Sequence, residues 1–346
     1  MNNIKYIILP LLCLFTIMLT QGCNSADDSG PKATSIIHKL FVTASEPGSA
    51  IYLDGVYTGK VTPSELVVEK GEHMVGVGLK DSKTYLRRTV TVEVTTKTLT
   101  VDLNNNDLQG PKVWKALFIG VNKVTANVGA CVSEYTTAEL DLAYEFFNWS
   151  FKDKVEDYSY NTTKWEIERR DISDETIVLS NEKLITPSII DNYITDINKG
   201  DYDLIVTFFR GGAGSQQNCF IDNFIGIAWF DVTELNSDAS YYTIRYYDDI
   251  EGTINDAKQN DPGMFIHEWL HTTAEMFYPD RGEKVPSDNG QVVHAAGKYG
   301  YSHPWMSWYE DLISGKVRDG STYSGIGPDA FLECTVKESA LGACPQ

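Results

Sequence analysis

The sequence predicts an α+β protein in which a small all-β module precedes a larger domain that mixes helices and strands. Two observations carry this prediction. From Leu40 to Leu103, short apolar runs alternate with turn signals and no helical periodicity occurs. From Lys112 to Gln346, apolar runs typical of buried strands alternate with segments whose apolar residues recur at helical spacing. The length of 346 residues is enough for two or three domains.

The composition indicates a soluble globular protein and excludes nucleic acid as a partner. Hydrophobic residues make up 42% of the chain and charged residues 22%. The formal net charge is −19, whereas phosphate binding requires clustered Lys and Arg. The densest basic stretch surrounds Arg87 and Arg88 and forms no such cluster. We attribute the acidity to solubility.

Residues 1–22 have the composition of a signal peptide. Lys5 is their only charged residue, and Tyr6–Thr20 is almost continuously apolar but short for a transmembrane helix. Polar residues after Cys23 suit a tether over residues 23–36. The Gly-Cys step that ends the segment resembles the signal of bacterial lipoproteins. This resemblance implies a lipid on Cys23, attachment to a membrane through it, and a periplasmic or cell-surface location. An uncleaved membrane anchor is the alternative, and both imply export.

Export affects how the cysteines are interpreted. Four of them lie beyond the signal and the candidate lipid site, an even number in an oxidising compartment, so we expect two disulfides. Three pairings are possible, and we favour the short C-terminal loop as one bridge. The spacings do not match a zinc–cysteine site. The favoured pairs are Cys334 with Cys344 and Cys131 with Cys219.

The all-β module is expected over residues 37–104. Asp54-Gly55 is a hairpin-type turn between two apolar runs. The segment also contains Pro47-Gly48-Ser49-Ala50, Tyr52-Leu53-Asp54-Gly55, Gly59, Thr62-Pro63 and Gly71-Glu72-His73. By these residues it resembles the PEGA domain, a small β module of bacterial surface proteins. The resemblance implies a spacer or cell-wall contact and no chemistry, so we interpret His73 as a plain strand residue.

A turn-rich linker over residues 104–111 leads into the second domain, expected over residues 112–346. Thr137 can cap a helix with apolar residues at helical spacing as far as Phe147, and Thr186-Pro187 opens a second helix that extends to Ile197. Buried strands are expected at Trp114–Val121, Asp203–Phe209, Phe224–Phe230 and Tyr241–Tyr247.

A further helix carries the residues of greatest chemical interest. It is expected to start near Asp261-Pro262, with Asp261 as cap, and it contains the HExxH pattern His267, Glu268 and His271. The two histidines are four residues apart, so their rings project from one helix face and can share a metal ion. Zn²⁺ accepts imidazole nitrogen readily. Glu268 lies about 100° around the helix from His267 and can accept a proton from the attacking water as general base.

The third zinc ligand is open at this stage. Glu275 continues the i, i+4 series, but in a straight helix it lies about 12 Å along the axis from His267, so a contact to a ligand or a solvated face fits it better. We favour His294, because the loop before it is long enough to return the chain over the metal. Tyr301, or failing that Tyr299, is expected to stabilise the oxyanion. The alternative ligands are Glu310, His303, Asp280 and Asp288.

The helix around His267 and His271 resembles that of the zincin metallopeptidases. Ala274 and Phe277 stand where the metzincin pattern needs Gly and His, so that group is excluded. The resemblance implies an α+β fold in which the motif helix packs on a mixed sheet and an edge strand binds extended substrate. Residues 225–230 and 241–247 are the candidates for that strand, and an ordinary core position is the alternative for each.

The expected function is that of an exported zinc metallopeptidase acting on protein or peptide substrates. Zinc would activate water, with Glu268 as general base and Tyr301 supporting the oxyanion. Two alternatives remain. One is a zinc hydrolase of non-peptide or cell-wall amide bonds, and the other is a non-catalytic surface binding protein that retains the motif.

Overall fold

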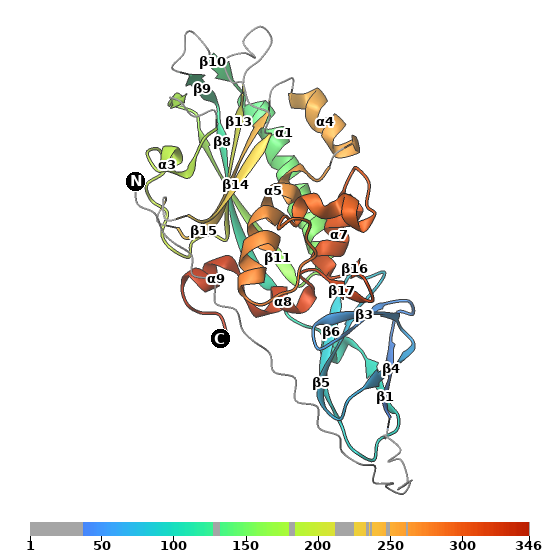
Figure 1. Ribbon diagram of the computed structural model, residues 1–346. Helices are drawn as coiled ribbons and strands as arrows, with labels where there is room; N and C mark the ends of the chain where they lie inside the picture. Colours follow the sequence, from blue (N-terminus) through green and yellow to red (C-terminus); the bar gives the residue numbers. More distant parts are fainter. Residues whose placement is uncertain are drawn as a thin grey trace, which may run out of the picture. The chain divides into compact units, whose positions relative to one another are not determined.

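The computed structural model describes most of the chain beyond the tether (Figure 1). The expected signal peptide, Cys23, Cys131, Cys219 and Asp261 lie outside the described residues, as do the predictions that concern them. The mixed α+β class with an N-terminal all-β module is confirmed. The described residues are 37–126, 132–179, 184–211, 225–232, 235, 237–246, 250–260 and 262–345.

Two small sheets form the all-β module. One has the order β4-β1-β7 and the other the order β3-β2-β5-β6, and their inner faces share a core that includes Leu40, Ile51 and Val77. Asp54 and Gly55 both adopt positive φ, 51° and 83°, as the expected hairpin turn requires. The strands are β1 (His38–Ala44), β2 (Ala50–Leu53), β3 (Val56–Val61), β4 (Ser64–Val68), β5 (Gly71–Gly78), β6 (Tyr85–Val92) and β7 (Leu99–Leu103).

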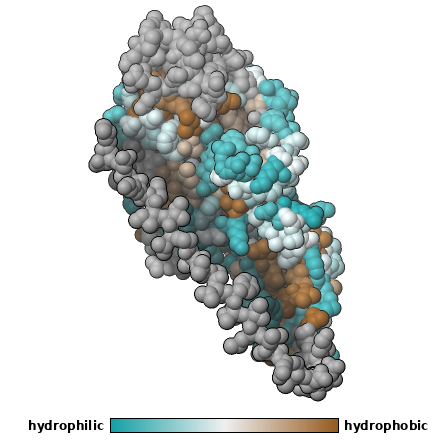
Figure 2. Space-filling model, in the orientation of Figure 1, coloured by the Kyte–Doolittle hydropathy of each residue, from teal (hydrophilic) through white to brown (hydrophobic). Residues whose placement is uncertain are grey.

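In the view of Figure 2, apolar surface gathers over this module, whereas the surface around α4 (Ile250–Asn260) and α7 (Met306–Ser314) is mostly hydrophilic. The exposed apolar side chains of the module include Phe41, Val56 and Val67.

A five-stranded sheet is the centre of the second domain. Its order is β11-β8-β13-β15-β14, with all neighbours parallel except β14, which pairs antiparallel with β15 at one edge. The two faces of β8 enter different cores, because Phe118 packs on the motif-helix side and Leu117 on the other. The strands are β8 (Lys112–Val121), β11 (Thr163–Ile172), β13 (Leu204–Arg210), β14 (Gly226–Val232) and β15 (Ala239–Tyr246).

Most helices cover the sheet face that carries Phe118, whereas α3 (Pro187–Ile190) packs on the opposite face (Figure 1). The helices are α1 (Thr137–Asn148), a π-helix (Trp149–Val155), α2 (Glu156–Tyr158), α3, α4, α5 (Met264–Thr272), a second π-helix (Thr273–Phe277), α6 (Tyr278–Asp280), α7, α8 (Pro328–Glu333) and α9 (Val336–Ala340), with 3₁₀ turns at Asn105–Asp107 and Val293–Tyr299. The short strands are β9 (Lys123–Ala126), β10 (Val132–Glu134), β12 (Ile177–Leu179), β16 (Val317–Asp319) and β17 (Thr322–Ser324).

Three local expectations differ from the structure. The cap of α1 is Thr136 and not Thr137, because Thr136 and Glu139 form a reciprocal capping box. The second helix ends at Ile190, where the Asn192 amide donates to the Ser188 carbonyl and competes with the helical pattern. Strand β11 had no prediction, because its charged residues mask the strand signal.

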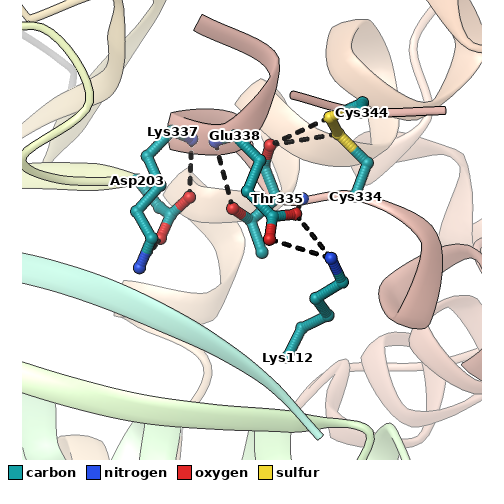
Figure 3. The surroundings of a disulfide bond; sticks show 7 residues. All are labelled: Lys112, Asp203, Cys334, Thr335, Lys337, Glu338 and Cys344. Carbon is teal, nitrogen blue, oxygen red and sulfur yellow. Dashed lines mark hydrogen bonds and ion pairs between the residues drawn. A yellow bond between two sulfur atoms is a disulfide. The ribbon is translucent and has the colours of Figure 1, made fainter. Parts of the chain in front are cut away.

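The C-terminal bridge between Cys334 and Cys344 is confirmed, and Figure 3 shows how it sits among polar contacts. Glu338 of α9 accepts from Lys112 of β8 at 2.8 Å. The buried carboxylate of Asp203 accepts from the backbone N–H of Lys337 and from that of Lys115, both at 2.7 Å. The C-terminal helix is therefore joined to the beginnings of two central strands.

The all-β module packs directly on the second domain. Tyr52 and Tyr85 are buried in a small cluster with Tyr160. The Tyr85 hydroxyl donates to Asp329 of α8 at 2.7 Å, and Arg87 pairs with the same carboxylate at 3.0 Å. Among the described residues, no helix is long and apolar enough to cross a membrane.

Candidate metal centre

Helix α5 presents the motif histidines on its pocket side. Its apolar residues Phe265, Trp269 and Leu270 are fully buried in the core and thereby set the rotation of the helix. The helix begins at Met264, two residues later than expected, with Gly263 as its N-cap. A Cβ at Gly263 would lie 2.2 Å from the Tyr309 ring, so glycine permits the close approach of α7.

Three histidines converge beside this helix. His267, His271 and His294 each offer a ring nitrogen, and these nitrogens all lie within 4.8 Å of one another. The Nε2 atoms of His267 and His271 are 3.3 Å apart. The ring of His294 lies 4.9 Å from that of His267 and 5.0 Å from that of His271, measured between centroids.

The Nδ1 atoms of His267 and His271 each lie within hydrogen-bond distance of an oxygen atom. Nδ1 of His267 is 2.9 Å from the hydroxyl of Tyr309, and Nδ1 of His271 is 2.8 Å from Oε2 of Glu275. A carboxylate only accepts, so Nδ1 of His271 is the donor, and in the neutral ring Nε2 directs its lone pair toward the other histidines. Metal-binding histidines are held in the same way.

Glu275 also holds the segment that carries the third histidine. Its Oε1 accepts from the backbone N–H groups of Val292 and Val293, at 2.7 and 3.0 Å. One carboxylate thus orients His271 and fixes the chain immediately before His294. Of the two positions expected for Glu275, the structure shows the one in contact with a candidate ligand.

The donor set is suited to Zn²⁺. Two nitrogens bound to one zinc ion at 2.0–2.1 Å with tetrahedral geometry lie about 3.3 Å apart. The separation of the two Nε2 atoms is 3.3 Å. Three imidazoles with one further position for a small ligand are a donor set found at catalytic zinc sites.

Burial keeps two of the three histidines neutral. Burial, together with the nearby His271 and His294, lowers the pKa of His267 to about 3. Burial and the proximity of His271 also lower the pKa of His294. For His271, burial opposes the charged form, but the hydrogen bond to Glu275 and the charges of Glu275 and Glu268 together outweigh it and raise the pKa. Neutral imidazole is the form that binds a metal.

Glu268 is the buried acid of the centre. Its residue is only 7% exposed, and burial raises the pKa of its carboxyl to about 7. A Cβ at Gly226 of β14 would lie 2.6 Å from the Glu268 carboxyl carbon. Glycine at this position therefore leaves the space that the carboxyl group occupies.

A pocket of about 610 Å³ opens over these groups. Strand β14 forms one wall, and among the described strands it pairs only with β15, so it is an edge strand. Ile225 and Met276 are 51% and 41% exposed and belong to the wall. The lining residues are Ile225, Gly226, Ile227, Ala228, Met264, His267, Glu268, His271, Glu275, Met276, His294, Trp305 and Tyr309.

The expected oxyanion tyrosines lie elsewhere. The hydroxyl of Tyr301 donates to Asp311 at 2.6 Å, and that of Tyr299 donates to the Ser287 carbonyl at 3.3 Å. Neither residue lines the pocket. The alternative ligands Glu310, His303, Asp280 and Asp288 do not belong to the three-histidine group.

The sequence did not lead us to expect two aromatic residues that line the pocket. Trp305 stacks on His267 with a centroid distance of 6.0 Å, and Tyr309 contacts the same histidine. They are four residues apart at the start of α7, so both face one side of the helix. Their four-residue spacing was the sequence pattern that could have identified them.

The comparisons with known proteins concern the N-terminal module. Residues 37–107 match the PEGA domain family, which confirms that resemblance and extends three residues beyond the expected boundary at 104. The search of curated proteins gives no match to the chain.

Proposed function

We propose that this chain is an exported zinc-dependent metallopeptidase. The observation that carries the proposal is the convergence of three histidine nitrogens and the buried carboxyl of Glu268 on one pocket beside an edge strand. His267, His271 and His294 would hold the ion. This arrangement suits hydrolysis of a carbonyl compound, and it lends support to the zincin resemblance of the motif helix.

Zinc in this position would supply a Lewis acid that polarises the scissile carbonyl. The residues of the chain supply proton transfer and orientation. Glu268 accepts the proton of the attacking water and returns it to the leaving amine, a role for which a pKa near 7 is well matched. Tyr309 and Glu275 orient His267 and His271 through their Nδ1 atoms. Tyr301 has no part in this proposal, because its hydroxyl is directed to Asp311.

A peptide is the substrate that the walls of the pocket favour. An extended peptide can add to the outer edge of β14 through main-chain hydrogen bonds, with its scissile bond near Glu268. The apolar wall formed by Ile225, Met264 and Met276 suits an apolar substrate side chain.

Export is supported by the sequence before the fold and by the bridge at its end. A disulfide such as Cys334–Cys344 persists in oxidising compartments and is rare in the cytosol. We propose that Cys23 carries a lipid that attaches the protein to a membrane. Mass spectrometry of the protein from its producing cell would test this, because a retained residue 22 contradicts it.

The test of the catalytic proposal combines zinc content with cleavage. We expect the purified full chain to contain one equivalent of zinc and to cleave casein or a mixed peptide library. The Glu268→Gln variant should keep its zinc and lose activity by about a hundredfold to ten-thousandfold. A chain that binds no zinc, or a Glu268→Gln variant as active as wild type, would overturn the proposal. Cleavage of peptidoglycan alone would favour the cell-wall amidase alternative.

A further inference from the structure

We propose that Tyr52 of the PEGA module is a positioning residue for the metal centre and acts through helix α7. The inference rests on the proposed zinc site. It assigns the module a part in holding that site, beyond the spacer or wall-contact role that its resemblance implies.

Tyr52 joins the module to the end of α7. Its hydroxyl donates to the Ser314 carbonyl at 2.8 Å. Tyr52 is fully buried, and Ser314 is only 1% exposed. A hydrogen bond at this depth has no water to replace it, so the carbonyl depends on the tyrosine.

This hydrogen bond completes the C-terminus of the helix. The last carbonyls of a helix lack helical partners. In α7, the Asp311 carbonyl still accepts from the N–H of the C-cap residue Gly315, and it also accepts from the Lys316 N–H at 2.7 Å. The next two carbonyls accept from the N–H groups of Ile326 and Gly327 at 2.8 and 3.0 Å. The fourth accepts from Tyr52, and this is the partner that the other module supplies.

The opposite end of α7 contacts the metal centre. Tyr309 is 2.9 Å from Nδ1 of His267, and Trp305, the N-cap residue, stacks on the His267 ring and contacts that of His294 edge-on at 6.3 Å between centroids. Helix α7 is only nine residues long. A displacement of its last turn therefore moves its first turn as well, because a helix this short shifts as a rigid body.

The experiment compares zinc affinity among conservative variants of the full chain. Chelator competition should show that Tyr52→Phe weakens zinc binding about threefold to tenfold, less than the change of a direct partner of a ligand. Tyr309→Phe, which removes such a partner, should weaken it by at least about tenfold. Hydrogen exchange of the zinc-free protein should also be faster in the last turn of α7 in Tyr52→Phe.

Tyr85→Phe is the matched control. It removes another buried tyrosine hydrogen bond between the same two modules, but to Asp329 of α8, none of whose residues lines the pocket. We expect a comparable loss of thermal stability and a zinc affinity within twofold of wild type. Equal losses of affinity in the two variants would mean that the module stabilises the fold without positioning the site.

The double variant Tyr52→Phe/Tyr309→Phe tests whether Tyr52 acts on the metal centre through α7. If Tyr52 acts through α7, the double variant binds zinc about as weakly as Tyr309→Phe alone, because coupled residues are not additive. Additive losses, or an unchanged affinity in Tyr52→Phe, overturn this inference and leave the proposed function standing. A wild-type chain that binds no zinc overturns both.

Discussion

His73 in the PEGA module and His267 in the second domain occupy opposite surroundings. His73 lies on β5 and pairs with Asp54, a half-exposed carboxylate 2.8 Å away. The hydrogen bond to Asp54 raises the pKa of His73, whereas burial beside two other histidines lowers that of His267 to about 3. A lone carboxylate thus favours a charged imidazole. Burial among other histidines keeps the lone pair of His267 available, as a cation would require.

The comparison extends from these residues to their modules. The PEGA module has an apolar core, and its buried His38 and Asp107 each have a polar partner, the Thr96 carbonyl and Arg88. The second domain buries Glu268 and Asp203 and collects three histidines at one pocket. Buried ionisable groups cost stability unless they are paired or neutral, so their concentration makes the second domain the candidate region for chemistry.

The largest expected difference between the two regions is the effect of zinc on the stability of their histidine variants. We expect zinc at a thousandfold excess over its dissociation constant to raise the free energy of unfolding by about 4 kcal/mol. His267→Ala should abolish this gain, and His73→Ala should retain it. Urea unfolding with and without a chelator measures the effect, and an equal gain in both variants would place zinc elsewhere.

Glu275→Gln should lower zinc affinity by about tenfold to a hundredfold, because the amide keeps the shape of the side chain but loses the charge that orients His271. Chelator competition measures it. Glu72→Gln on β5 changes an exposed carboxylate of the PEGA module and serves as the control. An unaltered affinity in Glu275→Gln would show that the neighbouring carboxylate is dispensable.

Gly226→Ala should reduce cleavage by about tenfold with zinc content unchanged, since the added methyl group displaces the Glu268 carboxyl. Gly110→Ala is the control, because a Cβ there meets no atom within 4 Å. Equal activity of the two variants would mean that Glu268 has room to move without loss.

The smallest effect is expected for His73→Asn. The raised pKa of His73 stabilises the folded state below the unfolded pKa of about 6.5, and this contribution is lost as pH rises through the folded pKa. Because Asp54 is half exposed, we expect less than about 1 kcal/mol at pH 5.5 and no difference from wild type at pH 9. Urea unfolding at the two values checks the sign, and a difference that grows with pH contradicts it.

Strong local patterns made much of the fold predictable. The PEGA resemblance depended on turns such as Asp54-Gly55, which local chemistry determines. The buried strands β8 and β13 are continuous apolar runs. Strand β11 was missed, because Glu168 and Arg170 satisfy each other by a 2.9 Å ion pair that sequence alone does not show.

Helix geometry made part of the candidate site predictable. The four-residue spacing brings His267 and His271 together, and the loop length allowed His294 to join them. The direction of Tyr301 was not predictable, because it follows Gly300, which reverses the chain with a φ of 86°. Its partner Asp311 comes from α7, whose placement depends on tertiary packing.

The Cys334–Cys344 bridge affects what a proteolytic cut does to the chain. In the proposed exported location, the protein would meet proteases, which cut preferentially at exposed loops and chain ends. The bridge closes a loop with a sequence separation of 10 around α9. A single cut within that loop leaves both fragments covalently joined, so α9 remains beside Lys112 and Asp203. The bridge thereby keeps the segment that carries α9 in place after such a cut.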